Sequence, residues 1–228
     1  MTKKPLGIML VIVVLLVALG CGGSKVDQGV VKGNKGAVKS RADKDIPAKN
    51  RPKTKTDTIL INGEDKKFEF ALFDDETVRF STYIAEDMIG ERGMAENGGR
   101  IFVFAKDKDK KDINSSIEIT VKKKDAKNTV DYSVKAVKEL VQTHGFKVIE
   151  HRAGTPEQYN IPGARSKVEF AIKKQNAFRA EITGTGIVFE RGGYIYRIII
   201  QYPLDRENEF KPRVDKMLSD IMFYDEKN

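Results

Sequence analysis

Two long β-rich runs near the C-terminus constrain the fold more than any other part of the sequence. Residues 178–190 and 194–202 are rich in β-branched and aromatic side chains, and they meet at Arg191, Gly192 and Gly193. Glycines supply the positive φ angles that a tight hairpin turn needs. The two runs are therefore predicted to pair as antiparallel strands.

Alternating apolar residues predict four more strands before the first helix. Two of them have one apolar face each, formed by Phe68, Phe70 and Leu72 and by Val78, Phe80 and Thr82. The other two are 101–104 and 117–121, and the charged segment 106–112 between them is predicted to be an exposed loop.

The remaining elements include two amphipathic helices. Valines at 130, 134, 137 and 141 recur at helical spacing, with Asn128 or Thr129 as the cap and Gly145 at the end. Short strands are predicted at 146–149 and 168–172, separated by a break at 159–163. A C-terminal helix carries Phe210, Val214, Met217, Leu218 and Ile221 on one face, with Asp205 as a candidate cap and Pro212 expected in its first turn. Antiparallel strands with two well-spaced helices predict an α+β domain whose helices cover the sheet.

The N-terminus carries an apolar stretch, 6–19, behind two lysines and ahead of Cys21, the only cysteine. This arrangement resembles a bacterial lipoprotein signal peptide, with Gly20 and Gly22 fitting the pattern around the cysteine. The resemblance implies cleavage before Cys21 and lipidation of Cys21 with acyl chains such as palmitate, on an exported, membrane-anchored protein. An uncleaved signal anchor is the alternative, but 14 residues are fewer than the roughly 20 that a spanning helix needs.

The positive charge of the chain is concentrated in its first quarter. Residues 1–56 contain 12 of the 41 Lys and Arg residues but 3 of the 33 acids, so they carry a net charge of +9 and the rest carries −1. A near-neutral domain argues against nucleic acid as a partner. Segment 22–56 has no aromatic residue and few apolar ones, which predicts a disordered tether. A solvated spacer is the first interpretation of it, and adhesion to anionic lipid or an acidic envelope polymer is the alternative.

The predicted organisation is thus a signal peptide over 1–20, the lipidated cysteine and basic tether over 21–56, and a single domain over 57–228. The order of elements, the turn at 161–165, the hairpin at 192–196 and the closing segment 217–223 resemble the PsbP and DcrB superfamily. That resemblance implies an antiparallel sheet flanked by helices, a PsbP-like α/β/α sandwich, in an accessory protein of the envelope without a catalytic motif. With Gly22 after the cysteine, the lipoprotein sorting pattern implies the outer membrane where a cell has one.

The motifs that carry chemistry are weak in this sequence. His144 and His151 are too few for a zinc site, and His144 suits a helix C-terminus. Asp107, Asp109 and Asp112 lack the glycine and glutamate of a calcium loop, and Thr183–Gly186 is predicted to be a glycine bulge in a strand. No cofactor or metal is predicted.

Tyr194, Tyr196 and Tyr202 share one face of their strand, which predicts either sheet packing or a docking surface. Tyr194, Tyr196 and Arg197 are the candidate partner surface if that face is exposed. The leading hypothesis is a non-enzymatic, membrane-anchored envelope protein that binds a protein partner or supports assembly of an envelope complex. The alternatives are a carrier of a small apolar or lipid ligand, which needs a pocket of about 300 Å³ or more, and a carboxylate-dependent envelope hydrolase.

Overall fold

The structure is a computed structural model that describes residues 50–95, 98–151, 158–175 and 180–224. These residues all belong to one compact unit. Cys21, the predicted signal peptide and most of the predicted tether lie outside the described residues. None of the described helices is both long and apolar enough to cross a membrane.

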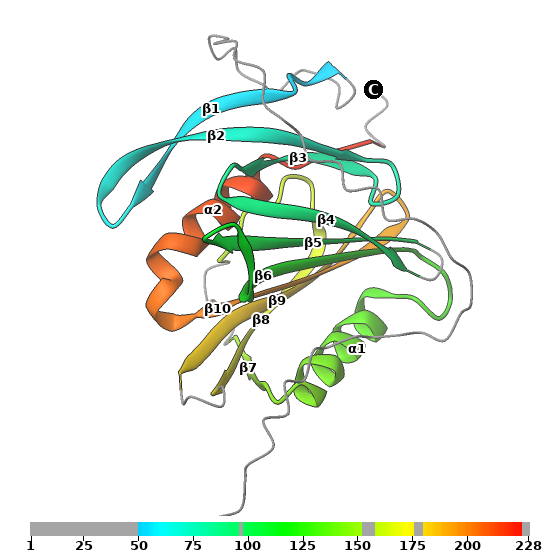
Figure 1. Ribbon diagram of the computed structural model, residues 1–228. Coiled ribbons are helices and arrows are strands. Elements are labelled where there is room, and N and C mark those ends of the chain that lie inside the picture. The colour runs from blue at the N-terminus through cyan, green and yellow to red at the C-terminus, as the bar shows by residue number, and fades with distance from the viewer. Residues whose placement is uncertain (1–49, 96–97, 152–157, 176–179, 225–228) are drawn as a thin grey trace, which may run out of the picture. The chain divides into compact units, whose positions relative to one another are not determined.

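A seven-stranded antiparallel sheet forms the larger part of the domain (Figure 1). Its spatial order is β4-β5-β6-β10-β9-β8-β7, so β10, the last strand of this sheet in sequence, lies between β6 and β9. The strands are β4 (Met88–Ala95), β5 (Gly98–Asp107), β6 (Lys110–Lys123), β7 (Lys147–Glu150), β8 (Arg165–Gln175), β9 (Glu181–Arg191) and β10 (Tyr194–Pro203).

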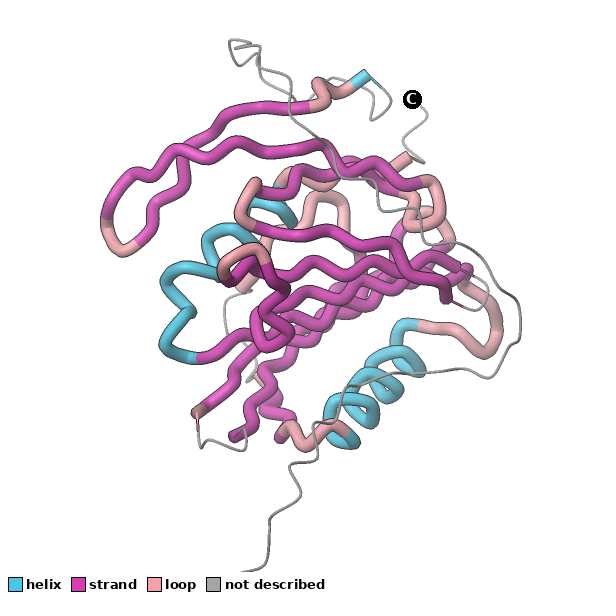
Figure 2. The backbone as a smooth tube through the Cα atoms, viewed as in Figure 1, coloured by secondary structure: helices cyan, strands magenta, loops and turns pink. Residues whose placement is uncertain are grey.

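A second, four-stranded sheet has the order β1-β2-β3-β11 and was not predicted as a separate sheet. Its strands are β1 (Thr54–Ile61), β2 (Glu64–Asp75), β3 (Phe80–Ala85) and β11 (Met222–Phe223). The chain passes between the two sheets through the short connection from β3 to β4. The tube in Figure 2 shows how strand dominates the described residues, with few helical turns.

In the described residues, α1 lies on one face of the seven-stranded sheet, and α2 packs between the other face and the four-stranded sheet, which confirms the predicted α+β class. Helix α1 (Val130–Thr143) packs Val137 and Val141 against one face, beside Phe170 and Ile195. On the other face the main core lies between this sheet, the four-stranded sheet and α2 (Glu207–Ser219), which follows the short 3-10 helix η3 (Leu204–Arg206). Residues that alternate along β10 therefore point to different layers.

Tight turns fix the register of the hairpins. Gly192 and Gly193 both have positive φ, 56° and 77°, and join β9 to β10 as predicted. Asn62 and Gly63, with φ of 54° and 81°, join β1 to β2 in the same way. Two positive φ angles match the twist of the flanking strands. The Asn-Gly pair is the strongest short hairpin signal in this sequence.

Helix α1 matches its prediction closely. The Thr129 hydroxyl accepts the N–H of Tyr132 at 3.2 Å, so Thr129 is the cap. Gly145, with φ of 81°, donates its N–H to the Gln142 carbonyl and ends the helix. Asn128 instead donates its amide to the Lys123 carbonyl at 2.7 Å, which ties the start of α1 to the end of β6.

Helix α2 differs from its prediction at both named positions. Pro212 lies inside the helix rather than in the first turn, and Asp205 makes no capping hydrogen bond. Pro212 has no N–H, so the Asn208 carbonyl, four residues earlier, lacks its helical donor. The packing of Phe210, Val214, Met217 and Leu218, all buried, holds the helix together across this missing bond.

Three further predictions about strands are corrected. Segment 106–112 is not a loop, because β5 and β6 continue into it and meet at Lys108 and Asp109, both with positive φ. No bulge exists at 183–186, since β9 pairs with β10 without a shift in register. Gly186 is required because the Phe170 ring occupies the space a Cβ would need. The folded part also begins before residue 57, since Arg51 is buried and β1 starts at Thr54.

Candidate functional site

Among the described elements, no helix packs on one half of one face of the seven-stranded sheet. Helix α1 packs against β7 to β10, and the same face of β4, β5 and β6 continues beyond it (Figure 1). Residues on this part of the face are partly exposed rather than buried. We call this surface the open face. Its members are Ile89, Glu91, Arg100, Phe102, Phe104, Glu118 and Thr120.

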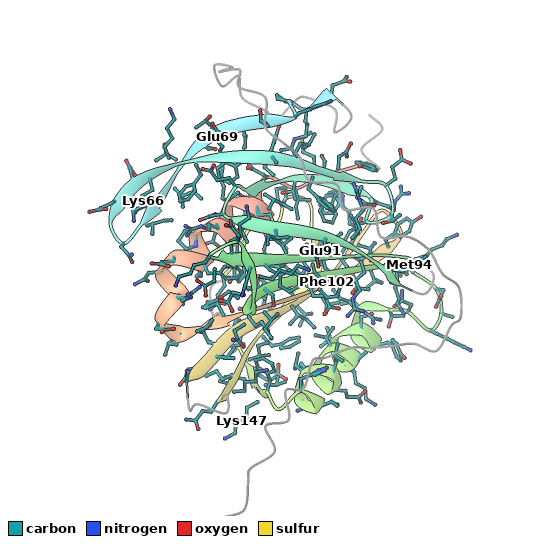
Figure 3. All side chains as sticks on the ribbon, in the orientation of Figure 1. Lys66, Glu69, Glu91, Met94, Phe102 and Lys147 are labelled. Atoms are coloured by element: carbon teal, nitrogen blue, oxygen red, sulfur yellow. The ribbon has the colours of Figure 1, made fainter. Side chains whose placement is uncertain are left out.

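Strand register places the open-face side chains in rows that cross the strands. One row runs from Glu91 through Phe102 to Glu118, and the next places Ile89 beside Phe104. Figure 3 shows Glu91 and Phe102 as neighbours on adjacent strands, with Met94 farther along β4. Two residues apart on β5, Phe102 and Phe104 point the same way, and their rings are stacked with centroids 6.0 Å apart. The rings therefore form one aromatic pair at the centre of the open face.

Two ion pairs lie beside this aromatic pair. Arg100 donates to Glu118 at 2.6 Å, and Lys111 forms an ion pair with Glu91. The same two cations lie near the rings, with the Arg100 guanidinium 4.7 Å from the Phe102 centroid and the Lys111 ammonium 5.6 Å from that of Phe104. Two cations and two anions beside the rings thus form two ion pairs, and the Lys106 ammonium, two residues beyond Phe104 on β5, donates to the Glu86 carbonyl.

A β-bulge borders the open face near the N-terminal end of β6. The β5–β6 register shifts after Phe104, and the extra residues of β6 are held by Asp112. The Asp112 carboxylate accepts the Asn114 N–H at 3.0 Å and the Ser115 hydroxyl at 2.7 Å, and it pairs with Arg206 at 3.2 Å. Bulges re-aim side chains at the rims of sheets. Here the bulge leaves Ile113 exposed beside the open face.

The predicted partner surface of Tyr194, Tyr196 and Arg197 is wrong as an exposed surface. Tyr196 is 1% exposed and stacks on Phe189 at 4.9 Å inside the main core, because the four-stranded sheet covers that face of β10. Tyr194 lies at the edge of the same core, under the Arg79 guanidinium at 4.5 Å. The alternative interpretation, sheet packing, is the one that applies.

Arg197 points to the opposite side of the sheet, in the row of Arg100 and Thr120. Its guanidinium donates to the Asn128 side chain at 3.0 Å and to the Ser133 hydroxyl at 2.9 Å, at the N-terminus of α1. Desolvation by burial lowers the pKa of Arg197. Arg197 therefore anchors α1 to the sheet at the border of the open face. It points away from Tyr194 and Tyr196 because successive residues of a strand face opposite sides of the sheet.

Neither histidine lies in a metal site within the described ranges. The His144 ring is exposed, and its Nδ1 lies 2.8 Å from the Leu140 carbonyl at the end of α1, consistent with the predicted helix-end role. Asp107 and Asp109 lie at the β5–β6 turn, and Asp112 holds the bulge. Among the residues that the structure places, no three His, Cys, Asp or Glu side chains gather as metal ligands.

Two surface grooves bear on the alternative functions. One of about 540 Å³ lies between the tip of the β1–β2 hairpin and α2, and one of about 550 Å³ lies between α1 and Val168 of β8. Both are large enough for a small ligand. Charged and amide side chains form most of the first lining, whereas the second groove exposes more apolar than polar surface between the stems of its charged residues. A carrier of apolar ligands needs a mainly apolar pocket, so the first groove does not favour that alternative.

The first groove also contains two carboxylates, Glu207 and Asp215. They lie eight residues apart on α2, about 12 Å along the helix axis. Paired carboxylates that cleave glycosidic bonds lie about 5 to 9.5 Å apart. Asp215 is in addition paired with Lys211 at 2.9 Å, although burial raises the pKa of its carboxyl group. The spacing and this ion pair do not favour the hydrolase alternative at this groove.

No protein family model matches the sequence, and no curated protein matches it. Solved structures with similar folds include a protein of Bacteroides thetaiotaomicron VPI-5482, at a TM-score of 0.43 and 11% identity. That match covers 69% of this chain and 49% of the other, so the chain spans about half the length of the Bacteroides protein. They also include the cyanobacterial PsbP of Synechocystis sp. PCC 6803, at a TM-score of 0.44 and 10% identity, covering 68% of this chain and 92% of that protein. Both TM-scores lie below 0.5, and we derive no function from either similarity.

Proposed function

We propose that this protein is a lipid-anchored envelope protein that binds a protein partner through the open face and performs no catalysis. The observation that carries the proposal is the aromatic pair of Phe102 and Phe104 on a sheet face that α1 leaves uncovered. Aromatic residues and arginine are enriched in the centres of protein interfaces. The open face has both, with charged residues around them.

The paired charges favour a protein over other partners. When a surface is buried, an unpaired charge loses its hydration at a large cost, whereas an ion pair that stays intact keeps its partner. Arg100 with Glu118 and Lys111 with Glu91 can remain paired when the open face is covered. A surface that binds nucleic acids, anionic lipids or acidic polymers needs an excess of positive charge. The partner we infer presents an apolar centre surrounded by hydrogen-bonding groups of no net charge.

The anchor in this proposal is Cys21, and the basic segment after it is the tether. Two or three acyl chains hold a protein stably at a bilayer, since each buried methylene contributes about 0.8 kcal/mol. A flexible tether of roughly 30 residues would span on the order of 30 Å, enough to let the domain meet a partner away from the bilayer. Cell fractionation of a Cys21→Ser variant tests this part, because loss of the anchor should move the chain from membranes to the soluble fraction.

Substituting both aromatic residues of the open face tests the binding proposal. We expect Phe102→Ser with Phe104→Ser to abolish capture of the partner after crosslinking in intact cells. Two interface residues worth about 2 kcal/mol each would weaken binding by roughly 10³-fold if their effects add. Both rings are only partly buried, so the variant should fold, which thermal unfolding checks.

The matched control is Tyr132→Ser with Ile149→Ser, which removes two exposed apolar side chains from α1 and β7. This control should capture the partner as the wild type does. Equal capture by all three folded proteins would exclude the open face as the binding site.

A further inference from the structure

The groove between the β1–β2 hairpin and α2 has a second, independent set of features. The hairpin extends over α2 (Figure 1), and Leu60, Asn62 and Gly63 at its tip form one wall of the groove. One stripe of α2 forms the other wall, with residues at helical spacing: Glu207, Asn208, Lys211, Pro212 and Asp215. The groove therefore has a rigid helix on one side and a turn of fixed geometry on the other.

Glu207 is the free charge of this groove. The Lys211 ammonium forms an ion pair with the Asp215 carboxylate at 2.9 Å. Glu207 has no cation at ion-pair distance among the described residues. Its one hydrogen-bond donor there is the Tyr202 hydroxyl, at 3.4 Å. Glu207 lies in the first turn of α2, where the helix dipole stabilises an anion. The groove thus presents a carboxylate that has no counter-charge among the described residues.

Neutral acceptors and apolar surface lie beside this carboxylate. The Asn208 carbonyl has no helical hydrogen-bond donor, because residue 212 is a proline and has no N–H. Asn62 adds a side-chain amide on the opposite wall of the groove. Leu60 is 62% exposed although it is a large apolar residue, and Pro212 lies across the groove from it. This combination suits a side chain that has an apolar stem and a cationic end.

Two buried tyrosines, Tyr159 and Tyr202, lie beneath α2 and bring their hydroxyl groups there. Tyr159 is fully buried, with the Lys211 ammonium 4.8 Å from its ring centroid. Burial raises the pKa of both Tyr159 and Tyr202, so both hydroxyls stay protonated beside Glu207 and Asp215. With Lys211 paired to Asp215, Glu207 is the charge of the groove that stays available to a cationic ligand.

We propose that this groove binds a lysine-type side chain presented by an extended segment of another protein. The ammonium group would pair with Glu207, the stem would pack on Leu60 and Pro212, and a backbone N–H of the segment would donate to the Asn208 carbonyl. The site is separate from the open face and does not depend on the function proposed for it.

Chemical-shift mapping on the ¹⁵N-labelled full chain in detergent micelles tests the site. The probe is the peptide acetyl-Ala-Leu-Lys-Leu-Ala-amide, and the comparison peptide has glutamine in place of lysine. We expect the lysine peptide to shift the amide signals of Asn62 and Gly63 in a saturable way. The glutamine peptide should bind at least about fivefold more weakly, because it cannot form the ion pair.

Two variants with the same charge change identify the carboxylate responsible. Glu207→Gln should weaken binding of the lysine peptide at least about fivefold, whereas Glu209→Gln should leave it unchanged, since Glu209 shares the first turn but does not line the groove. Shifts that are absent, that map away from the hairpin tip, or that are equal for the two peptides would overturn the proposal. So would equal losses in the two variants.

Discussion

Replacing Tyr196 with alanine should destabilise the domain by about 3 to 5 kcal/mol, the range for truncating a large aromatic residue in a core. Tyr196 is 1% exposed, stacks on Phe189 at 4.9 Å and meets the edge of Phe223 at 5.2 Å. Removing its ring would leave a cavity where the seven-stranded sheet meets the four-stranded sheet. Denaturant unfolding followed by circular dichroism measures the loss.

Tyr194→Ala is the matched control, because Tyr194 lies two residues away on the same face but at the edge of the core. It should cost about 1 kcal/mol or less, in the range of a single cation–π contact with Arg79. If Tyr196→Ala were no more destabilising than Tyr194→Ala, the four-stranded sheet would not cover this face of β10. The tyrosines would then return as a candidate docking surface.

Gly184→Ala should have the second largest effect, a loss of about 3 kcal/mol or more. A Cβ at Gly184 would overlap the backbone carbonyl oxygen of Ile200 on the neighbouring strand β10. A backbone atom in a central strand cannot move without disturbing the sheet, so the overlap costs more than a clash with a flexible side chain. Thermal unfolding of the variant measures the loss.

Gly63→Ala separates this clash from the conformational preference of glycine. Gly63 has a φ of 81°, but nothing lies within 4 Å of the position of its Cβ. The alanine variant should therefore cost about 1 to 2 kcal/mol, the penalty for an L-residue in the left-handed region. A loss at Gly184 no larger than this would show that strands β9 and β10 approach each other less closely than described.

Local patterns in the sequence predicted the elements that depend on local interactions. Thr129 and Gly145 mark the ends of α1, and Gly192 with Gly193 places the β9–β10 hairpin. Strands β1 and β4 were missed because their sequences lack clear alternation: β1 begins with polar residues, and β4 contains Gly90 and Gly93. Both are stabilised by pairing with a long neighbour, which a local pattern does not show.

The open face could not be predicted from local pattern, because its exposure depends on strand order. Phe102 and Phe104 alternate with Ile101 and Val103, so β5 has two apolar faces and either could face the core. Helix α1 covers β7 to β10 and stops short of β5 because β10 inserts between β6 and β9. That insertion pairs segments more than 70 residues apart in sequence, such as Glu118 with Ile199.

Site-specific photocrosslinking tests most directly whether the open face binds a protein partner. Benzoylphenylalanine would replace Phe102 in the full-length chain in intact cells, and Tyr132, 56% exposed on α1, would carry the same group as the control. We predict that irradiation yields one discrete protein adduct from position 102, that position 132 yields none, and that Phe104→Ser removes the adduct. No protein adduct at position 102, or equal adducts at both positions, would contradict the account.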